Sequence, residues 1–387
     1  MQILFDHQTF TQQDYGGISQ YFCELMTQLS KDPSLDFTIS LRYSQNENLH
    51  RHSHLNPFWS NRNNFFSDNP FFSSLQKKIG FNLLNYVFKN QIESIRVLKK
   101  QDFDIFHPTY YEPYFLKYLQ KKPYVLTVYD MIHELFPVYF SKDDLTKKWK
   151  KQLIENANVI IAISENTKKD IIKFTNIDPD QIQVIYLGNP FEKTIETRKF
   201  NNFLDPIAEG DPYLLFVGNR SGYKNFIFFI ESIAEFLQKD QDLHVFCAGG
   251  GSFNNIEKTI LKKLNIAQKV HYFQPNDFIM KNLYKNARAF IFPSLYEGFG
   301  LPILEAFSCG CPCLLSDTSS LPEVGGDAAL YFDPYDSVSL TAAVDHLLSD
   351  DNLRSHLIRK GNERLKLFSW ELTSNKTKKN YESLLTQ

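Results

Sequence analysis

The segment 289–310 constrains the fold more strongly than any other part of this sequence. Ala289–Phe292 is a short apolar run of a length that suits a buried strand, and Pro293 cannot continue that strand. Pro302 is favoured at the start of a helix, and Gly310 is favoured just past the end of one. The segment therefore predicts a buried strand, a loop and a short helix, which together are a unit of an α/β fold.

Two glycines and two glutamates give this predicted unit its chemistry. Gly298 and Gly300 let the backbone turn and let a ligand approach it closely. Glu297 lies in the loop, and Glu305 lies in the first turn of the helix or just beyond it. We expect both carboxylates to face the space above the C-terminal end of the strand, which is where α/β sheets bind ligands.

A helix start beside two carboxylates suits a sugar nucleotide. The start of a helix offers unpaired N–H groups and a partial positive charge, and both favour a diphosphate. An ionised carboxylate only accepts hydrogen bonds, so it matches the many hydroxyl donors of a sugar. Either glutamate alone is more simply interpreted as a solvated helix residue, but the complete segment weakens that interpretation.

The spacing of the two glutamates carries a family resemblance. Glu297 and Glu305 have seven residues between them, inside the string Tyr296–Ala306, and the match continues through Leu321–Val324 and Ala329–Pro334. This pattern resembles the signature of glycosyltransferase family 4, whose members are retaining enzymes. The resemblance implies an α/β protein with the GT-B fold, in which two Rossmann-like domains face each other across a cleft and a C-terminal helix crosses back.

The resemblance also implies roles for residues of this segment. Glu305 is expected to hold the ribose hydroxyls of the donor, and Glu297 is expected to hold the hexose. The adjoining backbone is expected to contact the donor as well, through Gly298, Phe299, Gly300 and Leu301.

The length and composition of the whole chain fit a two-domain globular protein. The sequence has 387 residues, of which 43% are hydrophobic, and its formal net charge of −2 gives no sign of nucleic-acid binding. It contains no run of about 18 apolar residues, so no membrane-spanning helix is expected. The N-terminus lacks a basic start and a long apolar segment, so we expect no secretory signal and a cytoplasmic location.

The cysteines and acidic pairs do not predict a metal site. Five cysteines, an odd number, indicate reduced thiols. Cys309, Cys311 and Cys313 are separated by single residues, whereas zinc motifs normally use two to four and need a second cluster. The motif Asp102-Phe103-Asp104 precedes its predicted strand, which is the wrong end for a metal-diphosphate site. We therefore expect a donor site without metal.

Breaks in the pattern of strands and helices place the domain boundaries. Residues 1–190 are expected to form an acceptor-side Rossmann-like domain, with an irregular excursion at 44–100. Residues 191–368 are expected to form the Rossmann-like domain that binds the nucleotide sugar, and the linker falls at about 187–211. Residues 369–387 are predicted to form a last helix, which by resemblance returns to the first domain.

Candidate ligand residues of the first domain follow its predicted strands. Gly16 and Gly17 come after the strand Ile3–Phe5 and before a helical pattern, so their amides are expected to face phosphate or acceptor. His107 and Asp130 end two further strands on the ligand side of the sheet. A lone histidine is usually structural, but by resemblance these two residues would lie near the sugar and the incoming acceptor.

The first loop of the second domain carries two cations. Residues 218–225 follow the predicted strand Tyr213–Val217, and they contain Arg220 and Lys224, which suit a diphosphate. In the family pattern an arginine commonly follows the first glycine directly, whereas Asn219 occupies that place here. The glycine run after the next predicted strand permits a nucleotide to approach closely and includes Gly249 and Gly250.

The excursion at 44–100 has two interpretations. It is either a solvated insertion with its own small apolar cluster or a surface that contacts lipid headgroups or a lipid-linked acceptor. The second interpretation rests on aromatic residues interleaved with basic ones, which are Lys77, Lys78, Lys89, Arg96, Lys99 and Lys100.

The combined pattern predicts a glycosyl transfer. The string 218–225 together with Phe106–Tyr111 looks most like bacterial mannosyltransferases of surface-polysaccharide assembly. This resemblance implies transfer of a hexose with retention from a nucleoside-diphosphate sugar, GDP-mannose in the first place, to a glycan or lipid-linked acceptor, with no cofactor. The alternatives are a UDP-sugar or another GDP-sugar with a different acceptor, a GT-B epimerase or phosphorylase, and a non-catalytic nucleotide-sugar-binding protein. A NAD-binding oxidoreductase is disfavoured because the Gly-x-Gly-x-x-Gly fingerprint is missing.

Overall fold

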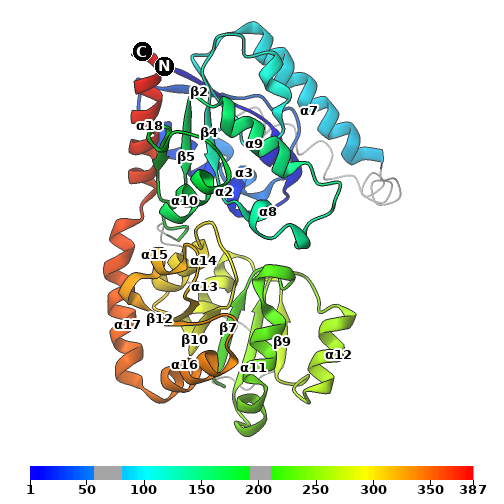
Figure 1. Ribbon diagram of the computed structural model, residues 1–387, viewed down its shortest axis with the longest axis vertical. Helices are drawn as coiled ribbons and strands as arrows, with labels where there is room; N and C mark the ends of the chain where they lie inside the picture. The colour runs from blue at the N-terminus through cyan, green and yellow to red at the C-terminus, as the bar shows by residue number, and fades with distance from the viewer. Residues whose placement is uncertain (56–80, 192–210, 387) are drawn as a thin grey trace. The chain divides into compact units, whose positions relative to one another are not determined.

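The computed structural model describes residues 1–55, 81–191 and 211–386, in which parallel strands alternate with helices. The chain divides into two units (Figure 1). The first unit contains Met1–Leu135, Phe140–Gly188 and Trp370–Gln387, and the second contains Phe136–Tyr139 and Asn189–Ser369. Both ends of the chain therefore belong to the first unit.

The first unit is built on two short parallel sheets, with strand orders β2-β1-β3 and β4-β5-β6. A parallel bridge between Phe106 and Tyr124 links the two sheets. Each strand is only three or four residues long, and β1, β3 and β4 are largely apolar and buried, as expected for strands covered on both faces. The strands are β1 (Gln2–Phe5), β2 (Asp36–Ile39), β3 (Ile105–His107), β4 (Val125–Val128), β5 (Val159–Ala162) and β6 (Ile182–Val184).

Helices connect these strands and cover them. The C-terminal helix, α18 (Trp370–Leu385), packs against α2 (Gly17–Leu29), where the rings of Trp370 and Tyr21 are 6.3 Å apart. The other helices of the unit are α1 (Gln8–Gln12), α3 (Glu47–Arg51), α7 (Phe81–Lys100), α8 (Ile132–Leu135), α9 (Thr146–Asn156) and α10 (Glu165–Phe174), with short 3-10 turns η1 (Ser53–Leu55), η2 (Pro113–Lys117) and η4 (Pro179–Gln181).

The second unit contains one six-stranded parallel sheet with the order β12-β11-β10-β7-β8-β9. The order runs outward in both directions from β7 and β10, as in the doubly wound nucleotide-binding fold. The strands are β7 (Tyr213–Val217), β8 (His244–Ala248), β9 (Val270–Phe273), β10 (Ala289–Phe292), β11 (Cys313–Ser316) and β12 (Ala329–Phe332).

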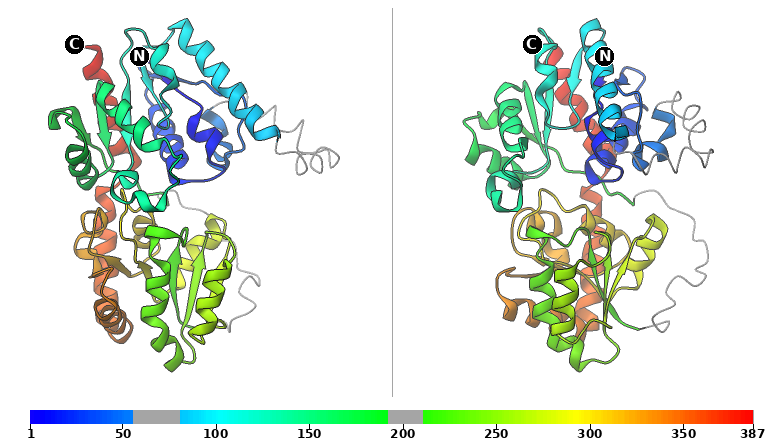
Figure 2. Two further views of the ribbon diagram at one scale, coloured as in Figure 1. Left: turned by 45° about the vertical axis from the view of Figure 1, so that its right-hand side comes forward. Right: turned by 90° about the vertical axis from the view of Figure 1, so that its right-hand side faces the viewer.

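The helices of the second unit lie around its sheet (Figure 2). Most helix starts carry a side-chain cap; Asn254, for example, forms a capping box with Glu257 at the start of α12. The helices are α11 (Phe226–Lys239), α12 (Asn255–Lys263), α13 (Asp277–Asn286), α14 (Leu301–Ser308), α15 (Leu321–Gly325), α16 (Ser337–Ser349) and α17 (Asp351–Arg364), with 3-10 turns η3 (Pro137–Tyr139), η5 (Gly222–Lys224), η6 (Gly326–Ala328) and η7 (Leu365–Leu367).

The core of the second unit forms where the apolar face of α11 meets the sheet. Phe229, Ile230 and Ile233 of α11 are fully buried against strand residues such as Phe216 and Val245. Burying one such side chain stabilises the fold by about 1.5–3 kcal/mol. The rigid sheet that results holds the loops at its C-terminal edge in fixed positions.

The strand pattern read from the sequence is confirmed, with small shifts at element ends. α14 begins at Leu301, one residue before the predicted start at Pro302, because Gly300 takes the N-cap position with φ +106°. α7 confirms the helix predicted for the later part of the excursion, while Lys77 and Lys78 lie outside the described residues. None of the helices in the described ranges is both long and apolar enough to span a bilayer.

Candidate active site

Two loops of the second unit meet at the C-terminal edge of its sheet. One follows β7 and the other follows β10, and these strands are neighbours. The backbone N–H of Leu295 donates a hydrogen bond to the carbonyl of Tyr223 at 2.8 Å, which ties the two loops together. The chain leaves β7 toward one side of the sheet and β10 toward the other. This is the point at which open α/β sheets bind ligands.

The two loops bring together a predicted cation and a predicted carboxylate. Lys224 Nζ lies 2.6 Å from Glu297 Oε1, although the residues are 73 positions apart in sequence. Both side chains are mostly buried, at 18% and 13% exposed. Lys224 Nζ also lies 5.5 Å from the ring centre of Phe292. The pair places an ammonium group, which donates hydrogen bonds, beside a carboxylate, which accepts them.

Two serines that the sequence analysis did not single out hold the Glu297 loop. Ser319 Oγ accepts a hydrogen bond from the backbone N–H of Glu297 at 3.0 Å. The hydroxyl of the buried Ser320 lies 2.9 Å from the carbonyls of both Glu297 and Phe299. Ser319 has φ +54°, an unusual conformation for a residue other than glycine. The serine run before Leu321 is the sequence signal for this support, since serines satisfy loop backbone groups.

The start of α14 keeps the features with which a helix N-terminus binds an anion. Its N-cap is Gly300, which has no side chain to cap the helix, and no acidic residue lies in its first turn. The first N–H groups of a helix have no partner within the helix and carry a partial positive charge. Gly300 lies in the left-handed region, and a Cβ there would come within 3.0 Å of Ile303. A glycine is therefore needed at this helix start.

Glu305 lies further along α14 and is half-buried. Its Oε2 accepts a hydrogen bond from the hydroxyl of Tyr284 on α13 at 2.9 Å. The pKa of Glu305 is raised to about 7, chiefly by burial; the Tyr284 hydrogen bond opposes the rise, and the charge of nearby Asp277 adds a smaller contribution to it. The predicted ribose ligand is therefore a carboxyl group that titrates near neutral pH.

The position of Arg220 differs from the predicted one. The sequence analysis places its guanidinium at a diphosphate, but the residue is only 4% exposed and its charge is paired with Glu257, whose Oε1 lies 3.0 Å from Arg220 Nε. The guanidinium also donates to the carbonyls of Gly249 and Gly251. Arg220 is therefore held against the glycine turn 249–251, where Glu257 neutralises its charge and the two carbonyls accept its hydrogen bonds.

His107 is also placed differently from the prediction. It ends β3 at the expected edge of the sheet, but its side chain is fully buried. Its Nδ1 lies 2.6 Å from the Tyr381 hydroxyl, its Nε2 lies 2.9 Å from Thr127 Oγ1, and burial lowers its pKa to about 3. Both ring nitrogens are engaged inside the core, so the structure assigns His107 a packing role instead of a contact with substrate.

Asp130 follows β4, where it was predicted, and its side chain is 33% exposed. Its carboxylate accepts from the backbone N–H of Ile132 at 3.1 Å. The fully buried Lys150 donates to the Asp130 carbonyl at 3.0 Å and lies 2.8 Å from Glu134 Oε2. Lys150 and Glu134 were not predicted as site residues. They hold the turn that presents Asp130, and no local pattern in the sequence indicates that a lysine of α9 is buried.

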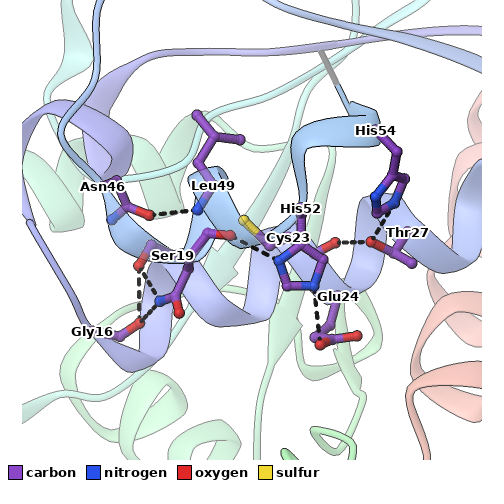
Figure 3. Close-up of polar contacts among 10 residues, drawn as sticks. Gly16, Ser19, Cys23, Glu24, Thr27, Asn46, Leu49, His52 and His54 are labelled. Atoms are coloured by element: carbon purple, nitrogen blue, oxygen red, sulfur yellow. Dashed lines mark hydrogen bonds and ion pairs between the residues drawn. The ribbon is translucent and has the colours of Figure 1, made fainter. Parts of the chain in front are cut away.

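The glycine pair after β1 begins a helix, as predicted. Gly16 is the N-cap of α2 and Gly17 is its first residue. Asn48 of α3 donates to the Gly16 carbonyl at 3.1 Å and to Ser19 Oγ at 2.9 Å. Gly16 and Ser19 are labelled in Figure 3. The start of α2 is thus held by α3, a short helix at the beginning of the excursion.

A buried carboxylate that the sequence analysis missed lies directly after β1. Asp6 is fully buried, and its two oxygens accept hydrogen bonds from Thr109, Gln8 and Tyr114. These donors come from the segments that follow β1 and β3, which are neighbouring strands: Gln8 begins α1, Thr109 lies in a loop and Tyr114 lies in η2. Asp6 therefore fixes the loops at the corresponding edge of the first unit, and a polar residue directly after an apolar strand is the signal that could have found it.

Two family models match the chain in succession. The Glycosyltransferase Family 4 model matches residues 15–192, and the model of Glycosyl transferases group 1 matches residues 197–364. The chain is 29% identical over 298 residues to O-antigen chain mannosyltransferase B of Escherichia coli, a match that covers 72% of this chain and 74% of that protein. It is 27% identical over 221 residues to O-antigen chain mannosyltransferase RfbU of Salmonella typhimurium, with 56% and 59% covered.

Solved structures agree on the fold. Sucrose-phosphate synthase of Thermosynechococcus elongatus superposes with a TM-score of 0.71 at 18% identity and covers 100% of this chain and 99% of its own. HepE of Anabaena, in complex with UDP and glucose, gives 0.70 at 15% identity and covers 99% of both chains. These neighbours, the parallel sheets and the two family matches lead to one assignment: the chain belongs to the group 1 glycosyltransferases with the GT-B fold, close to bacterial mannosyltransferases.

Proposed function

We propose that this glycosyltransferase moves a hexose, with mannose favoured, from a nucleoside-diphosphate sugar to a glycan or lipid-linked acceptor with retention of configuration. The observation that carries the proposal is the contact of Lys224 with Glu297 at the switch point of the second sheet. The similarity to O-antigen mannosyltransferases supports mannose, and GDP-mannose is therefore the favoured donor. A UDP-sugar or another GDP-sugar is the alternative donor.

Each residue of the donor site has a proposed role. The bond between the anomeric carbon and the diphosphate oxygen breaks, and a bond from that carbon to the acceptor oxygen forms on the same face. Negative charge grows on the leaving diphosphate, where Lys224 and the start of α14 stabilise it. The acceptor hydroxyl passes its proton to the leaving diphosphate oxygen, which balances the transfer. Glu297 holds hexose hydroxyls, Glu305 holds ribose hydroxyls, and Asp130 orients the acceptor.

We propose that the reaction needs neither a divalent metal nor a cofactor. The proposal is supported by the Lys224 side chain and the start of α14, whose positive charge would neutralise the diphosphate in place of a metal. Activity should therefore survive dialysis against EDTA. An absolute requirement for Mg²⁺ or Mn²⁺ would contradict this and would make the two aspartates of the motif Asp102-Phe103-Asp104 candidate metal ligands again.

The donor site is tested by calorimetric titration of GDP and UDP into variants. Lys224→Gln and Glu305→Ala should each weaken binding about tenfold or more, because one charge-assisted hydrogen bond is worth about 1.5–3 kcal/mol. Lys239→Gln is a matched control, since Lys239 pairs with Glu235 on an exposed surface of the same unit. Unchanged binding in both site variants would place the donor elsewhere, and saturation-transfer NMR with a panel of nucleotide sugars identifies the base and the sugar.

We also propose that the chain acts at the cytoplasmic face of a membrane, which it contacts through α7. Phe88 and Ile92, one turn apart on this helix, are 61% and 48% exposed. The exposed cations of the helix are Lys89, Arg96, Lys99 and Lys100. Each cation near an anionic leaflet contributes about 1 kcal/mol, and inserted apolar side chains add to it. The combination suits reversible attachment next to a lipid-linked acceptor.

Liposome flotation tests this contact. The protein should be recovered with floating anionic vesicles at low salt and should dissociate from them at high salt, because salt screens the attraction between its cations and the anionic lipids. Phe88→Ser combined with Ile92→Ser should reduce recovery, and so should replacement of Lys77, Lys78, Lys99 and Lys100 by Gln. Ile256→Ser is the matched control, since Ile256 is 69% exposed on the second unit. No flotation by the wild type would favour a soluble acceptor.

A further inference from the structure

The glycine turn after β8 has a backbone that only glycine adopts readily. Gly249, Gly250 and Gly251 have φ values of +89°, +73° and +76°. A Cβ on Gly250 would lie 2.8 Å from the Gly218 carbonyl oxygen and 3.2 Å from Arg220 Nη1. The turn is therefore closely packed against the loop that follows β7, and its conformation needs support from outside the turn.

Arg220 supplies that support. Its Nη1 donates to the Gly249 carbonyl at 2.8 Å and its Nη2 donates to the Gly251 carbonyl at 2.6 Å. Its guanidinium carbon lies 4.7 Å from the ring centre of Phe253, which packs over it. A single buried guanidinium group thus fixes the carbonyls of two residues in the same turn.

Glu257 fixes the arginine in turn. Its Oε1 accepts from Arg220 Nε at 3.0 Å, and both side chains are almost fully buried, at 2% and 6% exposed. Its Oε2 accepts from the backbone N–H of Asn254 in the capping box of α12. The arginine is therefore oriented by a carboxylate that is itself anchored at a helix start, and its charge is neutralised within the protein.

The direction of the two carbonyls determines the direction of their peptide N–H groups. In a trans peptide the N–H points opposite to the C=O of the same unit, and the chain has no cis peptide bond among its described residues. Because the carbonyls of Gly249 and Gly251 point to Arg220, the N–H groups of Gly250 and Ser252 point away from it. These N–H groups are suited to a phosphate oxygen at the edge of the sheet.

We propose that Arg220 and Glu257 are a positioning pair, which holds the 249–251 turn so that its N–H groups face the nucleoside diphosphate, and that Arg220 makes no phosphate contact of its own. The proposal rests on the proposed donor site. Glu257 is negatively charged and would by itself repel an anionic ligand. According to the proposal it nevertheless strengthens binding of the diphosphate, because it holds Arg220 in place.

Two conservative substitutions distinguish positioning from contact. Arg220→Lys keeps a positive charge, which is adequate for a direct phosphate contact, but it cannot donate to two carbonyls and a carboxylate in one plane. Glu257→Gln removes a negative charge and keeps the shape, so it should strengthen or spare binding if Arg220 contacts phosphate directly. The experiment is calorimetric titration of GDP and UDP into the full chain, with thermal melts to confirm folding and Glu235→Gln as the exposed control.

We expect each single substitution to weaken the binding of whichever diphosphate the wild type binds by roughly tenfold or more. The double variant should bind no more than about twofold more weakly than the weaker single variant, because the two residues act as one unit. Hydrogen exchange of the segment 248–253 should increase in Glu257→Gln, which reports on the turn even if binding is too weak to measure. Wild-type affinity in Glu257→Gln or in Arg220→Lys, or unchanged exchange in this segment, would overturn the proposal. If Lys224→Gln still loses binding in that case, the proposed donor site stands without it, whereas failure of the wild type to bind either diphosphate would overturn both.

Discussion

The protonation of Glu305 links the proposed donor site to the stability of the protein. Its pKa is raised to about 7, chiefly because the side chain is buried in α14 beside Tyr284. A ribose hydroxyl donates a hydrogen bond most strongly to the ionised carboxylate. If Glu305 holds the ribose as proposed, binding of the nucleotide favours the ionised form of its carboxyl group, which burial disfavours.

This competition predicts pH-dependent donor binding. Affinity for GDP or UDP should rise as the pH increases from 6 to 8, because a larger fraction of Glu305 is then ionised. The rise should disappear in Glu305→Gln, which keeps an oxygen for Tyr284 but does not titrate. Calorimetry at pH 6, 7 and 8 measures the effect. A pH dependence that is identical in both proteins would contradict the assignment of Glu305 to the nucleotide.

The same raised pKa predicts the direction of a stability change in the free protein. Between pH 4.5 and about 7 the native state binds one proton that the unfolded state has lost, so the free energy of unfolding falls as pH rises through this window. The loss amounts to about 3 kcal/mol in all for a shift of this size. Guanidinium unfolding at pH 5 and pH 8 should show this fall in the wild type and a smaller fall in Glu305→Gln. An equal fall in both proteins would assign the effect to other groups.

Residues of the candidate site differ in how far the sequence predicted them. Lys224 and Glu297 were predicted because each lies in a loop after an apolar strand, and such loops meet when the strands are neighbours. Arg220 and His107 lie at similar places, but their side chains turn into the protein toward Glu257 and Tyr381. Partners 37 and 274 residues away decide that direction, and no local pattern encodes them.

At the scale of elements, α3 shows how a short helix supports a loop. Asn46 caps it by accepting from the Leu49 N–H, and Asn48 reaches from it to the start of α2. His52, the residue directly after α3, lies 3.2 Å from Glu24 of α2, so a second polar contact joins this segment to α2 (Figure 3). The excursion that begins here thus contributes directly to the Gly16 loop. The sequence predicted neither α3 nor this contact, because five residues carry too little periodicity.

Removing the Asn48 contact should affect both stability and the proposed acceptor side. Asn48 is buried, so Asn48→Ala leaves two polar groups short of a donor and should cost about 1–3 kcal/mol. We expect the KM for the acceptor to rise while the affinity for GDP or UDP stays unchanged. Asn156→Ala is the matched control, since Asn156 lies at the exposed end of α9 and should change stability by less than about 0.5 kcal/mol. A loss of donor affinity equal to that in Lys224→Gln would contradict the separation of roles.

At the scale of the whole molecule, the chain closes the first unit with its last helix. Tyr381 of α18 is fully buried and its hydroxyl contacts His107, while the Thr373 hydroxyl donates to the Tyr186 carbonyl. Gly188 packs so closely on Trp370 that a Cβ on Gly188 would lie 2.3 Å from the backbone nitrogen of Trp370. The alternation of strands and helices predicted two α/β domains, and the family resemblance supplied the return of α18. Only the structure shows which side chains it meets.

The contact between α18 and β3 predicts that the two units respond separately to substitution. Tyr381→Phe removes the hydroxyl that satisfies His107 Nδ1 in the core and should destabilise the first unit by about 1–3 kcal/mol. For a unit of this size each kcal/mol shifts the melting temperature by about 2–4 °C. Calorimetry should show a lower transition for the first unit, while GDP or UDP still raises the transition of the second by mass action. Tyr335→Phe, at a residue that is 71% exposed, should leave both transitions in place. If Tyr381→Phe lowered both transitions equally, or abolished the stabilisation by nucleotide, the units would unfold as one, and α18 would support the donor site as well as the core it completes.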